Sequence, residues 1–185
     1  MTTVQHYIHG ELREELRKEA TMPLYNPATG QEIGSVPIAS DETRRDVLAS
    51  ATAGAAVWAA SSLSQRSAVL FKFRELLAQS TDELAALITR EQGKTLADAR
   101  GELARGLENV EFACGLIEHL KGDFSSGVAD GVDVHSFREP VGIVLAVTPF
   151  NFPAMVPLWM LANAVAAGNA VIVKPSERDP SAAVR

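Results

Sequence analysis

The residues best suited to chemistry form two short polar clusters, each directly after an apolar run. The first cluster follows GIVLAV at 142–147 and consists of Thr148, Pro149, Phe150 and Asn151. The second follows AVIV at 170–173 and contains Lys174, Ser176, Glu177 and Arg178. An ammonium group can donate to a ribose hydroxyl, and a neighbouring carboxylate can accept from one. An amide held after a buried strand is a candidate donor to a developing oxyanion.

The elements that must position these clusters are two strands and the helix between them. Both apolar runs are too short for a helix and rich in β-branched residues, which indicates strands buried on both faces of a parallel sheet. Pro153 suits the first position of a helix that ends at Gly168. The strand–helix–strand unit predicts a right-handed crossover, in which the carboxyl ends of both strands share one edge. We therefore expect the two clusters to meet there.

A second interpretation needs no ligand. Asn151 would cap the helix at Pro153, while Lys174 and Glu177 would be ordinary surface charges. The sequence contains no G-x-G-x-x-G fingerprint, so the usual dinucleotide signal does not help. Spacing alone leaves both interpretations open.

Short strands and then helices are predicted upstream. Residues 5–38 indicate a small leading sheet. Ser40 and Ser64 are expected to cap the first two helices, and Ser80 with Glu83 matches the capping-box pattern for a third.

A fourth helix is expected to carry a continuous apolar stripe over 96–117. Cys114 lies on this stripe, so we expect it to pack in the core. Residues 121–131 are rich in turn formers and indicate a linker, followed by a strand over 132–138. The expected organisation is strands and helices over 1–123, a linker and strand over 124–140, and the first crossover of a sheet over 141–185.

The composition excludes several classes of function. The net charge of −6 argues against a nucleic-acid partner. One cysteine rules out an internal disulfide framework, and the four scattered histidines do not indicate a metal site. We see no secretory signal and no apolar stretch long enough for a membrane helix, so we expect a cytoplasmic protein without a membrane partner.

Three stretches resemble the aldehyde dehydrogenase family in order and spacing. They are EQGKTLADARG at 91–101, TPFNFP at 148–153 and GNAVIVKPSE at 168–177. The resemblance covers essentially the whole chain. It implies an α/β fold: the N-terminal part of the family's architecture, helices followed by the first βαβ unit of a Rossmann-like parallel sheet. It also implies that 1–123 and 141–185 belong to the NAD-binding domain and that 124–140 lead toward the oligomerisation element.

The resemblance also implies roles for both clusters. In the family, the Asn at the position of Asn151 donates its amide to the reaction's oxyanion, and residues matching Lys174 and Glu177 contact the adenosine ribose. Residues around Thr148, Pro149 and Phe150 line the cofactor cleft, and Ser176 follows the same strand as Lys174. NAD is favoured over NADP, because Glu177 would repel a 2′-phosphate.

Finer features resemble the methylmalonate-semialdehyde branch of the family, which forms an acyl-CoA and uses CoA as co-substrate. They are RGLENVEF at 105–112, FNFPAMVPLWM at 150–160, and Arg178, which matches a position beside the cofactor. Arg105 matches an Arg implicated in binding the substrate carboxylate, although a surface ion pair with Glu102 or Glu108 is an equal alternative. The LAN run at 161–163 departs from the aromatic–proline pair usual in the branch.

The family's nucleophilic Cys and basic Glu are expected downstream of Arg185, in a catalytic domain outside this chain. We therefore expect the chain alone to be inactive, and the longer enzyme to be a homo-oligomer, either dimer or tetramer, acting on a small aldehyde. Two alternatives stay open. One is a dehydrogenase that releases a free acid instead of an acyl-CoA, and the other is a non-catalytic nucleotide-binding or subunit-contact fragment.

Overall fold

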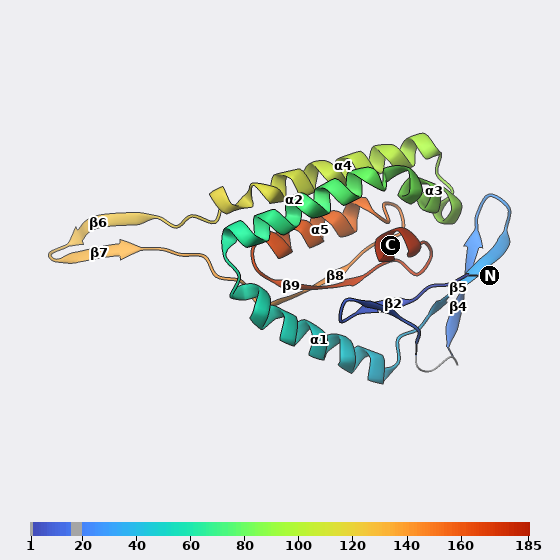
Figure 1. Cartoon of the computed structure of the whole chain (residues 1–185), viewed down its shortest axis with the longest axis horizontal. Coiled ribbons are helices and arrows are strands. Elements are labelled where there is room, and N and C mark those ends of the chain that lie inside the picture. Colours follow the sequence, from blue (N-terminus) through green and yellow to red (C-terminus); the bar gives the residue numbers. More distant parts are fainter. Residues whose placement is uncertain (1, 16–19) are drawn as a thin grey trace.

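The computed structural model describes residues 2–15 and 20–185. The leading strands form two small sheets rather than the single sheet predicted for residues 5–38. One has the order β1 (Thr2–Thr3), β5 (Gln31–Pro37) and β4 (Thr21–Asn26), and the other pairs β2 (His6–Ile8) with β3 (Glu11–Arg13). The first lies at the end of the molecule far from residues 124–135, and the second lies alongside the helix over 41–59 (Figure 1).

Four long helices follow. They are α1 (Asp41–Ala59), α2 (Leu63–Gln79), α3 (Thr81–Gln92) and α4 (Leu96–Cys114), with a short 3-10 turn η1 (Leu116–Glu118) after them. The cap predicted for α1 is confirmed, because the Ser40 side chain accepts a hydrogen bond from the Thr43 N–H.

The two other predicted caps were wrong. Ser62, not Ser64, caps α2, and it forms a reciprocal capping box with Gln65. Ser80 occupies the N-cap position of α3 but makes no side-chain cap hydrogen bond, because its φ of −93° and ψ of 3° differ from the extended backbone of a capping residue. Its N–H instead donates to the carbonyls of Leu76 and Leu77 at the end of α2.

The hydrophobic core lies between α2, α3, α4 and the later helix α5 (Met155–Ala166). Leu103 and Val110 of α4 are almost fully buried there, and Cys114 is buried beside them, which confirms its packing role. Burial raises the pKa of the Cys114 thiol, so the thiol stays protonated at neutral pH.

Residues 124–135 form a hairpin rather than the linker predicted for 121–131. Strand β6 (Phe124–Ala129) pairs antiparallel with β7 (Val132–His135). Asp130 and Gly131 make the two-residue turn, and Gly131 has a positive φ of 69°, a left-handed conformation that glycine adopts without a steric penalty. The hairpin extends away from the body (Figure 1), and residues 121–139 are all exposed. The strand expected over 132–138 ends at His135.

The predicted crossover is present. Strand β8 (Ile143–Val147) pairs parallel with β9 (Ala170–Lys174), and α5 connects them. Helix α5 starts at Met155, two residues after the predicted Pro153. Figure 1 shows the two strands between α5 and α1, and the indole N–H of Trp58 in α1 donates to the Val165 carbonyl at 2.8 Å.

One face of the sheet is open, so the prediction of strands buried on both faces was wrong for this chain. Leu145 and Val147 are 63% and 60% exposed, whereas Ala146 between them is 1% exposed. Helix α1 packs mainly on β9, so it leaves this face of β8 uncovered.

Within residues 2–15 and 20–185, no single helix is long and apolar enough to cross a membrane. Only α1 and α2 taken together reach that length and composition, and they are bent by 120° relative to each other.

Candidate functional site

The carboxyl ends of β8 and β9 bring the two polar clusters together. Val147 is paired with Lys174 in the register of the sheet. Beyond that pair, the buried Thr148 donates its N–H to the Lys174 carbonyl at 3.1 Å. Residues 148–151 and 174–178, far apart in sequence, therefore share one edge of the sheet, as predicted.

Phe150 and Arg178 connect the clusters directly. The Arg178 guanidinium lies 4.8 Å from the centre of the Phe150 ring, a cation–π contact. The Arg178 N–H donates to the buried Ser176 hydroxyl at 3.1 Å, which fixes the turn after β9. Pro149 is exposed beside Phe150.

Lys174 and Glu177 form an exposed ion pair on this edge, with 2.7 Å between Nζ and Oε2. The hydrogen bond from Lys174, together with a backbone N–H, lowers the pKa of Glu177, so its carboxylate is charged at neutral pH. Both side chains are about half exposed, and water screens their mutual attraction. An incoming hydroxyl-bearing ligand can therefore use both groups at little cost.

Asn151 is exposed on the same edge, and it does not cap α5 as the ligand-free interpretation predicted. Its side-chain amide makes no hydrogen bond with any residue in the described part of the chain, so the amide is free to donate. Its backbone carbonyl accepts a hydrogen bond from the Lys94 ammonium at 2.9 Å.

Glu102 of α4 provides the cap that α5 lacks locally. Its Oε1 accepts from the N–H groups of Ala154 at 2.8 Å and Met155 at 3.0 Å. Its Oε2 lies 2.6 Å from the Lys94 ammonium, and the Glu102 side chain is only 1% exposed. The sequence interpretation missed this network. The available signal was a carboxylate on the apolar face of α4, three residues after the buried Ala99.

A second buried carboxylate, Asp179, lies on the turn after β9. Neither of its oxygens has a hydrogen-bond partner in range within the described residues. Burial raises the pKa of Asp179 to about 6, and the nearby carboxylates of Glu91 and Glu102 add to this rise. The Ser176 hydroxyl and the Lys94 ammonium lie close enough to oppose it in part, although the hydroxyl is outside hydrogen-bond range. Glu91 itself accepts a hydrogen bond from the Ser181 N–H at the start of α6 (Ser181–Val184).

Arg105 lies apart from this edge. It is exposed on α4, and no ion pair or hydrogen bond within residues 2–15 and 20–185 connects it to Glu102, Glu108 or either cluster. The surface ion pair considered as its alternative role is therefore not formed, and Glu102 pairs with Lys94 instead.

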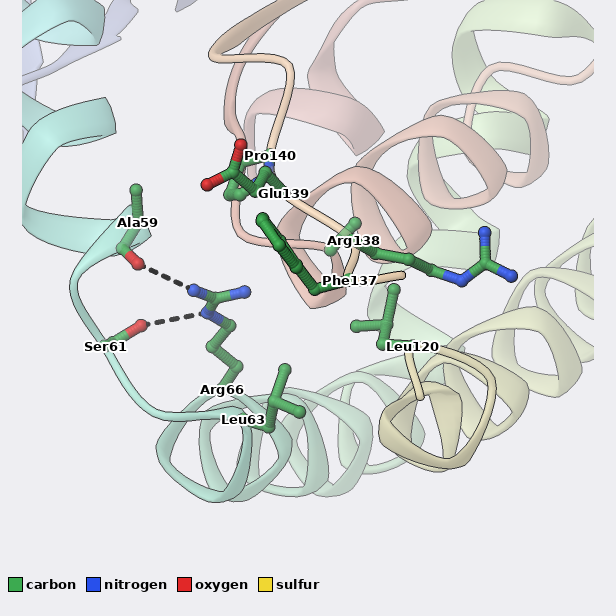
Figure 2. A pocket seen from close by; sticks show the side chains of 10 residues that line it. Ala59, Ser61, Leu63, Arg66, Leu120, Phe137, Arg138, Glu139 and Pro140 are labelled. Carbon is green, nitrogen blue, oxygen red and sulfur yellow. Dashed lines mark hydrogen bonds between the residues drawn. The ribbon is translucent and has the colours of Figure 1, made fainter. Parts of the chain in front are cut away.

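A cavity of about 380 Å³ lies elsewhere, between the α1–α2 turn and residues 137–140 (Figure 2). The buried Arg66 borders it and donates to the Ser61 hydroxyl and the Ala59 carbonyl, so its guanidinium braces the turn. None of the predicted site residues lines this cavity. No group of three or more potential metal ligands occurs in the described part of the chain.

The sequence model of the Aldehyde dehydrogenase family matches residues 15–185. The chain is 46% identical over 181 residues to malonate-semialdehyde dehydrogenase of Pseudomonas aeruginosa, covering 98% of this chain and 36% of that protein. It is 42% identical over 170 residues to the mitochondrial, acylating methylmalonate-semialdehyde dehydrogenase of Arabidopsis thaliana, covering 92% of this chain and 28% of that protein.

Solved structures agree with these matches. All of this chain superposes, with a TM-score of 0.96 and 44% identity, on 38% of a protein from Sinorhizobium meliloti 1021 assigned as a methylmalonate-semialdehyde dehydrogenase, in complex with NAD. The methylmalonate-semialdehyde dehydrogenase of Oceanimonas doudoroffii gives a TM-score of 0.95 at 44% identity, with 37% of that chain covered. The chain thus spans about a third of the length of the curated relatives that it matches.

Proposed function

Because the chain belongs to the aldehyde dehydrogenase family, we propose that it supplies the adenosine side of the NAD site and the oxyanion donor of a semialdehyde dehydrogenase. The observation that carries this proposal is the shared edge of β8 and β9. It places an unpaired amide, an ammonium and a carboxylate within two adjacent turns.

The exposed groups on this edge fit a dinucleotide. The Lys174 ammonium would donate to a ribose hydroxyl, and the charged Glu177 carboxylate would accept from one. The same carboxylate would repel a 2′-phosphate, which favours NAD over NADP. Thr148, Pro149, Phe150, Ser176 and Arg178 would border the bound cofactor. NAD, when bound, would accept the hydride that leaves the substrate carbon.

Asn151 would act on the substrate oxygen. Its amide has no competing hydrogen bond within the described residues, so it can donate to a carbonyl oxygen that gains negative charge during nucleophilic attack. Cys114 cannot be the nucleophile, because it is buried in the core and its thiol is held protonated. The nucleophile and the general base of the proposed reaction would come from outside residues 1–185, so we propose that these residues alone do not turn over an aldehyde.

We further propose that the reaction oxidises malonate or methylmalonate semialdehyde to an acyl-CoA, with CoA as co-substrate. The similarity to the acylating Arabidopsis enzyme supports this substrate class. Arg105 is proposed to contact the substrate carboxylate in the complete homo-oligomeric enzyme. A free acid is the alternative product. The cytoplasm remains the proposed compartment, although the Arabidopsis relative is named as mitochondrial.

A hybrid enzyme tests the proposed activity. In this hybrid, the 185-residue chain replaces the matching N-terminal part of the Pseudomonas malonate-semialdehyde dehydrogenase. We expect NAD reduction with malonate semialdehyde, and a drop in kcat of about 10²–10³ for Asn151→Ala, as for other oxyanion donors. Omitting CoA would separate the two products. A folded hybrid in which Asn151→Ala leaves kcat unchanged would refute the oxyanion role.

The 185-residue chain on its own should give no NAD reduction with either semialdehyde, with or without CoA. Turnover by the purified chain would contradict the proposal that the nucleophile and the general base come from outside residues 1–185.

A further inference from the structure

Lys94 and Glu102, from an earlier part of the chain, contact the backbone of the segment 151–155 that contains Asn151. Lys94, in the connection between α3 and α4, donates to the Asn151 carbonyl at 2.9 Å and lies 4.6 Å from the centre of the Phe152 ring. Its ammonium is 2.6 Å from Glu102, and both side chains are largely buried. The Lys94 ammonium therefore contacts the Asn151 carbonyl, the Phe152 ring and the Glu102 carboxylate at the same time.

Glu102 completes this support. Its other oxygen accepts from the N–H groups of Ala154 and Met155, at the point where α5 begins. Ala154 has no side chain that could cap the helix. A local cap would ordinarily come from a residue such as Asn, but Glu102 satisfies the same donors. The Asn151 amide is thereby released from capping and left available at the edge of the sheet.

We propose that Lys94 and Glu102 are positioning residues that hold the Asn151 backbone so that its amide points at the reacting oxygen. This inference rests on the proposed function, since it assigns a task to Asn151. An oxyanion donor is effective only when it is fixed before charge develops, and small displacements of such a group reduce the rate steeply. The pair is internal to the chain, so its contacts do not depend on the exposed faces of the fold.

The first test measures the loop in the 185-residue chain by ¹⁵N nuclear magnetic resonance. We expect Lys94→Met to lower the backbone order parameter of Asn151 from about 0.85, typical of rigid backbone, to below about 0.6. The Ala154 and Met155 amides should exchange with solvent about tenfold faster or more, whereas amides around Leu103 and Val110 stay protected. Lys94→Arg should restore the wild-type values.

Lys72→Met is the matched control, because Lys72 forms an exposed pair with Glu75 at 2.7 Å on α2. It should leave the Asn151 loop unchanged. If Lys94→Met leaves a chain that does not fold, the double variant Lys94→Met/Glu102→Gln takes its place. It has no unpaired buried charge, and Gln can still accept from Ala154 and Met155.

The second test measures kcat and KM in the hybrid enzyme. We expect Lys94→Met to lower kcat by about 10- to 100-fold with KM for the aldehyde nearly unchanged, because the lost contact acts in the transition state. Added to Asn151→Ala, the same substitution should cost little more, since Lys94 acts through Asn151.

The outcomes separate the two proposals. If Asn151→Ala lowers kcat but Lys94→Met does not, or if the two effects simply multiply, Lys94 has no positioning role. If Asn151→Ala itself has no effect, the oxyanion role fails, and the positioning role falls with it. Strong non-additivity together with a loosened loop would support the inference.

Discussion

Two Lys–Glu pairs lie in the candidate site at almost the same distance, and they differ in burial. Lys94 and Glu102 are 2.6 Å apart with side chains 12% and 1% exposed. Lys174 and Glu177 are 2.7 Å apart with side chains 52% and 43% exposed. Water screens the second pair but hardly reaches the first, so the electrostatic attraction is stronger in the buried pair although the two distances are almost equal.

The difference separates support from recognition. Both oxygens of the buried Glu102 carboxylate are engaged, one with Lys94 and one with the start of α5, so removing Lys94 or Glu102 leaves a buried charge unpaired. The exposed carboxylate of Glu177 can exchange its partner for water or a ligand. The same two residue types therefore hold the site in one place and remain available for binding in the other.

The largest predicted effect is on the buried pair. Glu102→Ala should lower the free energy of unfolding by about 3–5 kcal/mol, because it leaves the largely buried Lys94 ammonium without its carboxylate partner and two backbone N–H groups without an acceptor. Urea unfolding measures this loss. Glu75→Ala, in the exposed pair on α2, is the control and should leave the unfolding midpoint nearly unchanged. A loss for Glu102→Ala as small as the control's would remove the distinction between the pairs.

Asp179 extends the comparison to a buried carboxylate whose oxygens accept no hydrogen bond from any of the described residues. Its pKa in the folded chain is about 6, above the ordinary 3.8, so the folded state binds the proton more tightly than the unfolded state. The resulting stability is fully present below pH 3.8 and is lost as the pH rises through 6. Asp179→Asn should therefore stabilise the chain at pH 8 by about 3 kcal/mol, at roughly 1.4 kcal/mol per pKa unit.

The pH dependence provides the control for this substitution. The advantage of Asp179→Asn, measured by urea unfolding, should shrink as the pH falls and disappear near pH 4. An equal advantage at pH 4 and pH 8 would show that the titration of Asp179 is not its source.

Gly106 tests how tightly the buried side of the site is packed. A Cβ at this position would come within 2.5 Å of the Leu158 Cδ1 atom in α5. Gly106→Ala should therefore destabilise the chain by about 1–3 kcal/mol, through overpacking between α4 and α5. Gly101→Ala on the same helix meets no atom within 4 Å and should stabilise it slightly through helix propensity. Thermal unfolding that ranks the two variants in the opposite order would contradict this packing.

The smallest effect on stability is expected at the exposed pair. Glu177→Gln should change the free energy of unfolding by less than about 1 kcal/mol, since exposed ion pairs contribute little. A larger loss in urea unfolding would indicate that Glu177 stabilises the fold and is not simply available for ligand binding.

Contacts local in sequence were the predictable ones. The Ser40 cap, the β8–α5–β9 crossover and the shared edge follow from runs of apolar residues bounded by Ser, Gly and Pro. Two local signals were available but misinterpreted. Ser62 with Gln65 matches the capping-box pattern, and Asp130–Gly131 is a typical hairpin turn.

Contacts between distant segments were not predictable in this way. Glu102 caps a helix that begins more than fifty residues later, and the residue pattern of neither segment indicates that the two come into contact. The open face of β8 has a similar cause. The continuous apolar run and its β-branched residues indicate that Leu145 and Val147 suit a buried strand, but which element covers them depends on the whole fold.

Calorimetric titration of NAD into the 185-residue chain tests most directly whether the exposed edge is a cofactor site. We predict saturable one-to-one binding that Glu177→Gln weakens about tenfold or more, because a hydrogen bond to a charged acceptor is lost. Glu75→Gln in the matched exposed pair should leave the affinity unchanged. A folded chain that gives no saturable heat, or a Glu177→Gln variant that binds NAD as tightly as the unaltered chain, would contradict the account.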